Sequence, residues 1–209
     1  MKYIDFKNRF ADVPVINISS IEGAVKNSES LRDNVNKWVK KGYLIRLKNN
    51  LYIFNDNDRK TGVSGKFIAN YIYTPSYVSL EYAVYYYGMI PETVYQVTSV
   101  TTQKTAEFKN RLGVFAYSNL NSRLFFGYKA RKDENNMQVL VACPEKALLD
   151  FTYLRLCRRK GKKDAVGFAR ENRIQNLKLL NKKRFKEYLG KFPERNREEL
   201  LAVYKKGEK

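Results

Sequence analysis

Side chains able to contact nucleic acid gather along one predicted helix, residues 28–42. Leu31, Val35 and Trp38 recur there at helical spacing and predict an apolar stripe that packs into a core. The side chains beside this stripe that could face a ligand are Ser30, Arg32, Asn34, Asn36, Lys37 and Lys40. Asn pairs well with adenine edges and Arg or Lys with guanine edges, so this face could read bases in a DNA major groove.

Three further cations, Lys41, Arg46 and Lys48, follow the helix. The β-rich runs 43–47 and 51–54 predict a hairpin, with the three residues between them as its turn. We expect these cations to contact phosphates, which position a protein on DNA without reading its sequence.

The order of the predicted elements is typical of a winged helix-turn-helix. Helices are predicted over residues 3–11 and 19–25, and Gly42 ends the polar helix just before the hairpin. The alternative is a helix face that meets only solvent, which Asp33 favours because a carboxylate faces phosphates poorly.

A second concentration of cations lies in the C-terminal third. Residues 131–209 hold 22 basic and 11 acidic residues, a net charge of +11. The candidate residues of this second basic surface are Arg155, Arg158, Arg159, Lys160, Lys162, Lys163, Lys182, Lys183, Arg184 and Lys186. Such a surface could add phosphate contacts or dock an acidic partner, and a solvated charged surface is an equal alternative.

The net charge of the whole chain is +19, from 40 Lys and Arg against 21 Asp and Glu. An excess of this size calls for an anionic partner, and nucleic acid is the commonest one. No run reaches the roughly 18 apolar residues of a membrane span, and residues 1–14 carry scattered charges where a signal peptide would be apolar. We therefore expect a cytoplasmic protein that does not enter a membrane.

Several kinds of catalytic and metal site are excluded by residue type. The chain has no histidine and only two cysteines, so the usual four-ligand zinc sites and histidine-dependent catalytic triads are impossible. Asp56 and Asp58 lack a third ligand nearby, and residues 62–66 lack the spacing of a phosphate-binding loop. The sequence therefore predicts no catalytic residues, no metal and no cofactor.

A polar, glycine-containing segment at residues 55–65 predicts a boundary between a domain of residues 1–60 and a second of residues 61–209. In the second domain, helices are predicted over 66–71 and 79–87, strands over 94–102, 113–117, 124–128 and 138–142, and helices from Pro144 onward. This pattern predicts an α+β domain with a small, mostly antiparallel sheet followed by basic C-terminal helices.

Residues 74–105, TPSYVSLEYAVYYYGMIPETVYQVTSVTTQKT, resemble the core of the AbiEi-family antitoxins of type IV toxin–antitoxin systems. The segments LGVFAY at 112–117, FFGY at 125–128 and ACPEKALLD at 142–150 continue the resemblance, which covers roughly residues 1–155. Within these segments we expect Ser79, Glu81 and Asp150 to support the fold, as a helix cap and hydrogen-bonding groups at helix ends.

The resemblance implies a phage-defence regulator. Its N-terminal domain would bind inverted repeats upstream of its own operon, as a homodimer or through both basic surfaces of one protomer, and repress transcription. Its second domain would help to counteract a nucleotidyltransferase-like toxin, without requiring a stable complex, in an abortive-infection system.

Three other functions fit the residues alone. A protein-interaction module would dock an acidic partner without preferring any DNA sequence. An RNA-binding protein would prefer single strands or structured RNA. An enzyme would bring carboxylates together only in the folded chain.

Overall fold

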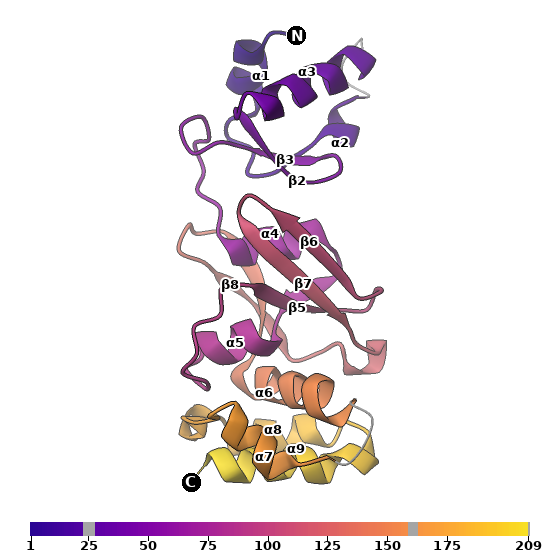
Figure 1. Cartoon of the computed structure of the whole chain (residues 1–209), viewed down its shortest axis with the longest axis vertical. Coiled ribbons are helices and arrows are strands. Elements are labelled where there is room, and N and C mark those ends of the chain that lie inside the picture. Colours follow the sequence, from indigo (N-terminus) through magenta and orange to yellow (C-terminus); the bar gives the residue numbers. More distant parts are fainter. Residues whose placement is uncertain (23–27, 159–162, 209) are drawn as a thin grey trace.

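The computed structural model describes residues 1–22, 28–158 and 163–208, except for the side chains of residues 22, 28 and 29. The described part is a mixed α+β structure with helices packed around two sheets. Figure 1 shows three tiers: N-terminal helices over a small sheet, a larger sheet in the middle, and C-terminal helices beyond it. The two termini lie at opposite ends of the molecule (Figure 1).

The N-terminal tier contains α1 (Tyr3–Phe10), β1 (Ile16–Asn17), α2 (Ile18–Glu22), α3 (Ser28–Lys40), β2 (Leu44–Lys48) and β3 (Leu51–Phe54). Its strands form an antiparallel sheet in the order β1-β3-β2. The predicted apolar stripe of α3 is confirmed, because Leu31, Val35 and Trp38 are buried against Phe6 and Phe54 in one hydrophobic cluster.

The β2–β3 hairpin is apolar on both faces. Leu44, Tyr52 and Phe54 pack toward the N-terminal helices. Ile45 and Ile53, on the opposite face, belong to a second cluster, which extends into the larger sheet. The turn has two residues, not the three predicted, because β2 continues through Lys48 and only residues 49 and 50 connect the strands.

The larger sheet has six strands in the order β6-β7-β5-β4-β9-β8. They are β4 (Ser76–Val78), β5 (Val97–Thr101), β6 (Ala106–Asn110), β7 (Gly113–Asn119), β8 (Tyr128–Lys132) and β9 (Gln138–Ala142). The β4–β9 and β5–β7 pairs are parallel and the other three antiparallel. Most of the pairs are antiparallel, as predicted, but the sheet is larger and mixed, since β4, β6 and β8 were not predicted.

The two faces of this sheet are covered by different helices. Helix α4 (Gly65–Ile72) and the hairpin pack on one face, where Val139 and Val141 point. Helix α5 (Leu80–Tyr86) and the C-terminal tier pack on the other, where Leu140 and Ala142 point. This alternation of neighbouring side chains between two cores is the geometry of a strand buried on both faces.

The strand predicted over 124–128 is not formed. The chain makes a short 3₁₀ turn, η1 (Ser122–Leu124), and β8 begins only at Tyr128. Gly127 lies between them with φ 73°, and a Cβ there would come within 3.0 Å of side-chain atoms of Lys146 and Tyr188. Glycine is therefore required at this close approach, which turns the chain before the strand starts.

The C-terminal tier contains α6 (Pro144–Thr152), the π-helical turn η2 (Tyr153–Cys157), α7 (Ala165–Glu171), the 3₁₀ turn η3 (Leu177–Leu179), α8 (Lys182–Leu189) and α9 (Glu194–Gly207). Every residue of α6 from Glu145 to Thr152 is buried. Pro144 begins this helix as predicted. The N–H that proline lacks would have no partner within the helix at this first position.

An ion pair is enclosed in the core between α6 and β4. Lys146 and Asp150 are ion-paired, and each side chain is 0 % exposed. Asp150 Oδ2 also accepts hydrogen bonds from Tyr77 Oη (2.8 Å) and Ser79 Oγ (2.9 Å). Burial raises the pKa of Asp150 and lowers the pKa of Lys146. The expectation that Ser79 caps a helix is wrong, because its side chain makes no cap bond.

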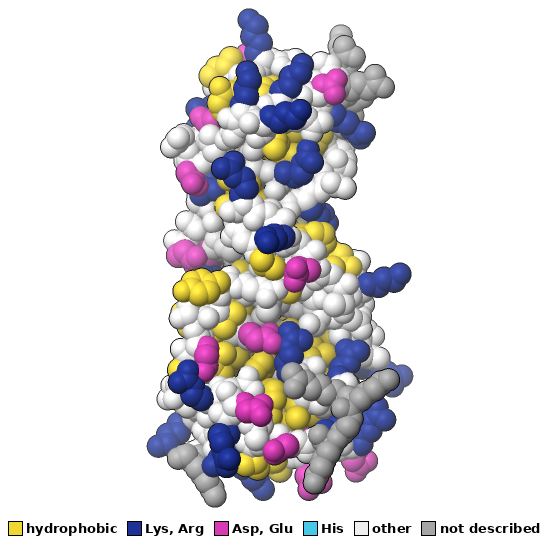
Figure 2. All heavy atoms as spheres, viewed as in Figure 1, with side chains coloured by type: hydrophobic (Ala, Val, Ile, Leu, Met, Phe, Trp, Pro, Cys, Tyr) yellow, Lys and Arg dark blue, Asp and Glu magenta, His cyan; other side chains and the backbone are white. Residues whose placement is uncertain are grey.

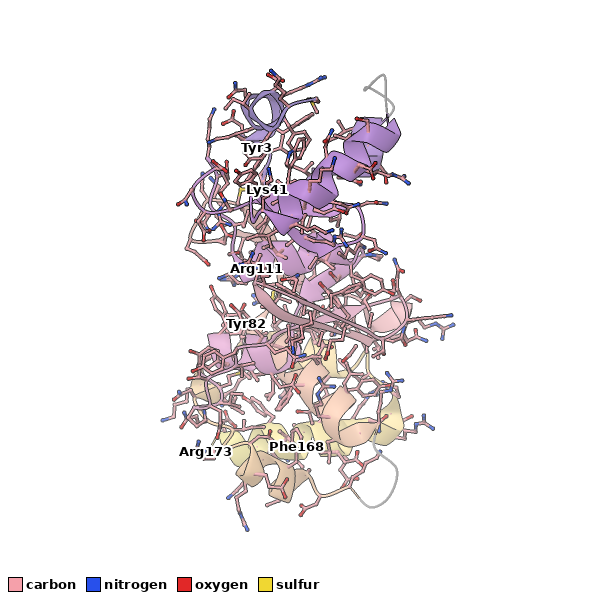
Figure 3. The ribbon with its side chains drawn as sticks, turned by 45° about the horizontal axis from the view of Figure 1, so that its top comes forward. Tyr3, Lys41, Tyr82, Arg111, Phe168 and Arg173 are labelled. Carbon is pink, nitrogen blue, oxygen red and sulfur yellow. The ribbon has the colours of Figure 1, made fainter. Side chains whose placement is uncertain are left out.

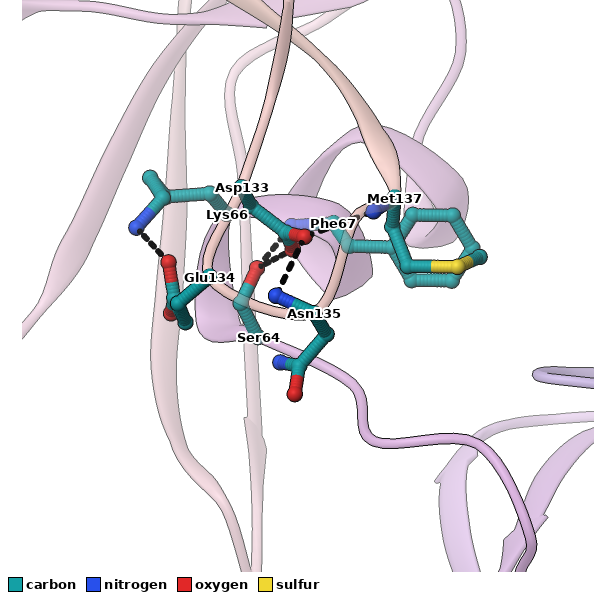
Figure 4. Close-up of polar contacts among 7 residues, drawn as sticks. All are labelled: Ser64, Lys66, Phe67, Asp133, Glu134, Asn135 and Met137. Carbon is teal, nitrogen blue, oxygen red and sulfur yellow. Dashed lines mark hydrogen bonds and ion pairs between the residues drawn. The ribbon is translucent and has the colours of Figure 1, made fainter.

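The connection from the hairpin into α4 is fixed by the β8–β9 turn (Figure 4). Ser64 caps α4 by accepting from Phe67 N (3.1 Å), and its hydroxyl donates to Asp133 Oδ2. Lys66 forms a 2.8 Å ion pair with Glu134. The segment 62–66 therefore anchors the start of α4 to the β8–β9 turn.

Candidate nucleic-acid interface

Helix α3 presents a polar outer face opposite its buried stripe. The predicted side chains that are exposed on this face or just after it are Ser30, Arg32, Asn36, Lys37, Lys40 and Lys41. Gly42 has φ 76°, a left-handed conformation that ends the helix and turns the chain into β2. Figure 3 locates Lys41 at this end of α3, and Figure 2 shows Lys and Arg side chains spread over the N-terminal tier.

A hydrogen bond ties α3 to the hairpin. Arg46 Nη2 donates to Asn36 Oδ1 over 2.7 Å, and the Arg46 guanidinium lies 5.6 Å from the centre of the Tyr52 ring. Both contacts hold an exposed cation beside the polar face of the helix. Asn34 lies on the other flank, half-buried, with a long 3.5 Å contact to Ser30 Oγ.

A hollow of about 360 Å³ separates α3 from the hairpin turn. Its described lining residues are Ile18, Arg32, Val35, Asn36, Arg46, Asn49, Asn50 and Tyr52, and none of these is acidic. Sequence reasoning missed Asn49 and Asn50 as part of this surface. Their position in a tight turn was the available signal, since Asn tolerates the left-handed conformation that Asn50 adopts at φ 64°.

The ammonium group of Lys48 does not line this hollow. Its Nζ donates to Ile72 O over 2.5 Å and lies 5.6 Å from the centre of the Phe108 ring. These partners belong to α4 and β6, so Lys48 joins the N-terminal tier to the larger sheet. Lys48 therefore has a structural contact, and a phosphate contact by this residue stays a prediction.

The second basic surface is mostly engaged within the protein. Arg155 forms a two-bond ion pair with Glu81, and Arg158 donates to Asn119 O over 2.8 Å. The remaining ion pairs are Lys163–Glu199 at 3.5 Å, Lys182–Glu208 at 2.6 Å and Arg184–Glu145 at 3.5 Å. Lys183 and Lys186 are exposed on α8. Arg159, Lys160 and Lys162 lie outside the described residues.

These contacts reduce the positive charge that the second basic surface has available for an anionic partner. A cation already paired with a carboxylate adds little net charge for a phosphate to meet. Among the residues of this surface that the structure describes, paired cations therefore outnumber the exposed Lys183 and Lys186.

Carboxylates do not converge on a metal-binding cluster in the described part of the chain. Asp58 accepts hydrogen bonds from Tyr3 and Lys7, which lower the pKa of its carboxyl group. Asp56 is ion-paired with Arg59. The two aspartates considered as metal ligands therefore have separate protein partners.

Within residues 1–22, 28–158 and 163–208, no helix has both the length and the apolar character needed to cross a membrane. In comparisons with known proteins, no family model matches this chain, and no curated protein matches it.

Proposed function

We propose that the protein is a sequence-specific double-stranded DNA-binding regulator, with residues 1–60 acting as a winged helix-turn-helix. In this proposal, α3 enters the major groove and its Asn36, Lys37 and Lys40 side chains meet base edges or phosphates. The observation that carries the proposal is the exposed polar face of α3 joined to Arg46 across a hollow whose described lining has no carboxylate.

The finer proposal is a cytoplasmic autorepressor and antitoxin of an AbiE-like type IV system. It is supported by the resemblance of residues 74–105 and 142–150 to the AbiEi family. The operator would be an inverted repeat, which a homodimer matches by its own twofold symmetry. The toxin would be nucleotidyltransferase-like, and direct contact with it is not required.

Fluorescence anisotropy tests the DNA proposal. The full chain is titrated into the duplex from just upstream of its own gene and into a scrambled duplex, each at two salt concentrations. We expect a preference of about a thousandfold for the upstream duplex, and weaker binding to both duplexes at higher salt. Equal affinity for the two duplexes would overturn sequence-specific recognition, and preference for single-stranded RNA would favour the RNA-binding alternative.

Asn36→Ala and Asn34→Ala form a matched pair for this assay. Asn36 lies beside Arg46 at the hollow, whereas Asn34 lies on the opposite flank of α3. We expect Asn36→Ala to reduce the preference for the upstream duplex at least tenfold, and Asn34→Ala to change it much less. A larger loss in Asn34→Ala would show that the other flank of the helix faces the DNA.

A further inference from the structure

A second hollow, of about 390 Å³, lies in the C-terminal tier, where the π-helical turn η2 meets the start of α9. Its described lining residues are Tyr153, Cys157, Arg158, Lys163, Arg195 and Asn196. Helices α9 and α3 lie at opposite ends of the molecule (Figure 1). The hollow is therefore separate from the candidate DNA interface, and inferences about it do not depend on DNA binding.

Three cations border this hollow. The Arg158 guanidinium is held in place by its bond to Asn119 O, and Arg195 is exposed on the first turn of α9. Lys163 approaches Glu199 at 3.5 Å, so one carboxylate partly offsets the charge. Glu199 also keeps one oxygen buried without a partner among the described residues, and Glu194 lies in the first turn of α9. The three cations outnumber these two carboxylates, so a positive charge of about one unit remains to favour an anion.

The start of α9 adds a positive end of a helix dipole. This helix has 14 residues, and its N-cap, Pro193, has no side chain that could accept from the first-turn N–H groups. The N–H group of Asn196 is bonded to Pro193 O, and the other first-turn N–H groups are a favourable position for a phosphate or carboxylate.

Asn196 adds a mostly buried polar side chain to the hollow. The residue is 3 % exposed and lines the hollow. Its side-chain amide is not among the described side-chain atoms that are both fully buried and unpartnered, so a little of its surface stays accessible. A polar side chain in this position can donate a hydrogen bond to a ligand in the hollow.

We propose that this hollow binds a phosphate group, either as inorganic phosphate or as the phosphate of a small phosphomonoester. Arg158, Lys163 and Arg195 would supply the countercharge, and Asn196 Nδ2 would donate to a phosphate oxygen. A tetrahedral anion with several acceptor oxygens suits a hollow lined by several donors, which an uncharged ligand would leave unsatisfied.

Thermal unfolding and titration calorimetry of the full chain test the proposal. Inorganic phosphate, adenosine monophosphate and adenosine are each compared with sodium chloride at matched ionic strength. For a Kd of about 1 mM, we expect 20 mM phosphate to raise Tm by about 4 °C or more. Tighter binding of adenosine monophosphate than of phosphate would identify a phosphomonoester, and equal binding would identify the free anion.

Arg195→Ala should weaken phosphate binding at least tenfold. The charge-matched control is Arg170→Ala, because Arg170 is exposed on α7 and does not line the hollow. Asn196→Asp should also abolish binding, since it places a carboxylate in the site, with circular dichroism confirming the fold. The proposal is overturned if neither phosphate nor adenosine monophosphate binds, if adenosine binds as well as its monophosphate, or if Arg170→Ala weakens binding as much as Arg195→Ala.

Discussion

Replacing Lys37 and Lys40 together by alanine should flatten the salt dependence of DNA binding. Four of the five exposed cations of the candidate interface enter this estimate: Lys37, Lys40, Lys41 and Arg46, without Arg32. If each neutralises one phosphate, the logarithm of the affinity falls with the logarithm of salt concentration with a slope of about −3.6. Raising the salt from 50 to 200 mM then weakens binding by about 150-fold.

The double variant retains two of these cations, so its slope should be about −1.8 and its loss over the same range about 12-fold. Anisotropy titrations at four salt concentrations measure both slopes directly. Lys205→Ala with Lys206→Ala is the matched control, because both lysines are exposed in the last turn of α9 and belong to neither candidate basic surface. An unchanged slope in the α3 variant, or an equal change in the control, would refute the placement of DNA against α3.

Three further predictions concern stability and the role of Lys48. Asp150→Asn should lower the free energy of unfolding in urea by about 3–5 kcal/mol, because it leaves the Lys146 charge buried without its partner. Adding Lys146→Met should recover part of this loss. Additive losses in the double variant would contradict the coupling of the two residues. Burial raises the pKa of Tyr87 to about 12, so this residue contributes stability that is complete below pH 10 and lost as the pH rises toward 12. Tyr87→Phe should make the free energy of unfolding in urea depend less on pH over that window. An identical pH profile in the variant would exclude the contribution. Lys48→Met should lower the free energy of unfolding by about 1–2 kcal/mol yet leave the salt slope of DNA binding unchanged, whereas a flatter slope would restore its role as a phosphate contact.

Patterns local to a few turns of chain were predictable from the sequence. The apolar stripe of α3, the helix stop at Gly42 and the strand at 138–142 each follow from spacing or residue type, and the structure has them. The helix of the candidate interface and the point where it ends could therefore be predicted from the sequence alone. Short strands were harder, since the three residues of β4 carry too little periodicity to separate a strand from a loop.

Long-range contacts could not be read from the sequence. Lys48 and Arg46 are two residues apart on one strand, yet one bonds to α4 and the other to α3. The cations of the C-terminal third form a dense run in the sequence, but their carboxylate partners, such as Glu81 and Glu208, come from distant positions. Charge counts along a chain therefore overestimate the charge that remains available on its surface.

The two-sided hairpin has a consequence for dissecting the protein. Ile45, Leu47, Leu51 and Ile53 pack against the larger sheet, so a fragment ending at residue 60 would expose an apolar β-ribbon to water. We expect such a fragment to self-associate and to lose the geometry that links Arg46 to α3. The larger sheet is thus a folding partner of the segment proposed to bind DNA, and chimeric regulators that borrow this segment should carry the sheet with it.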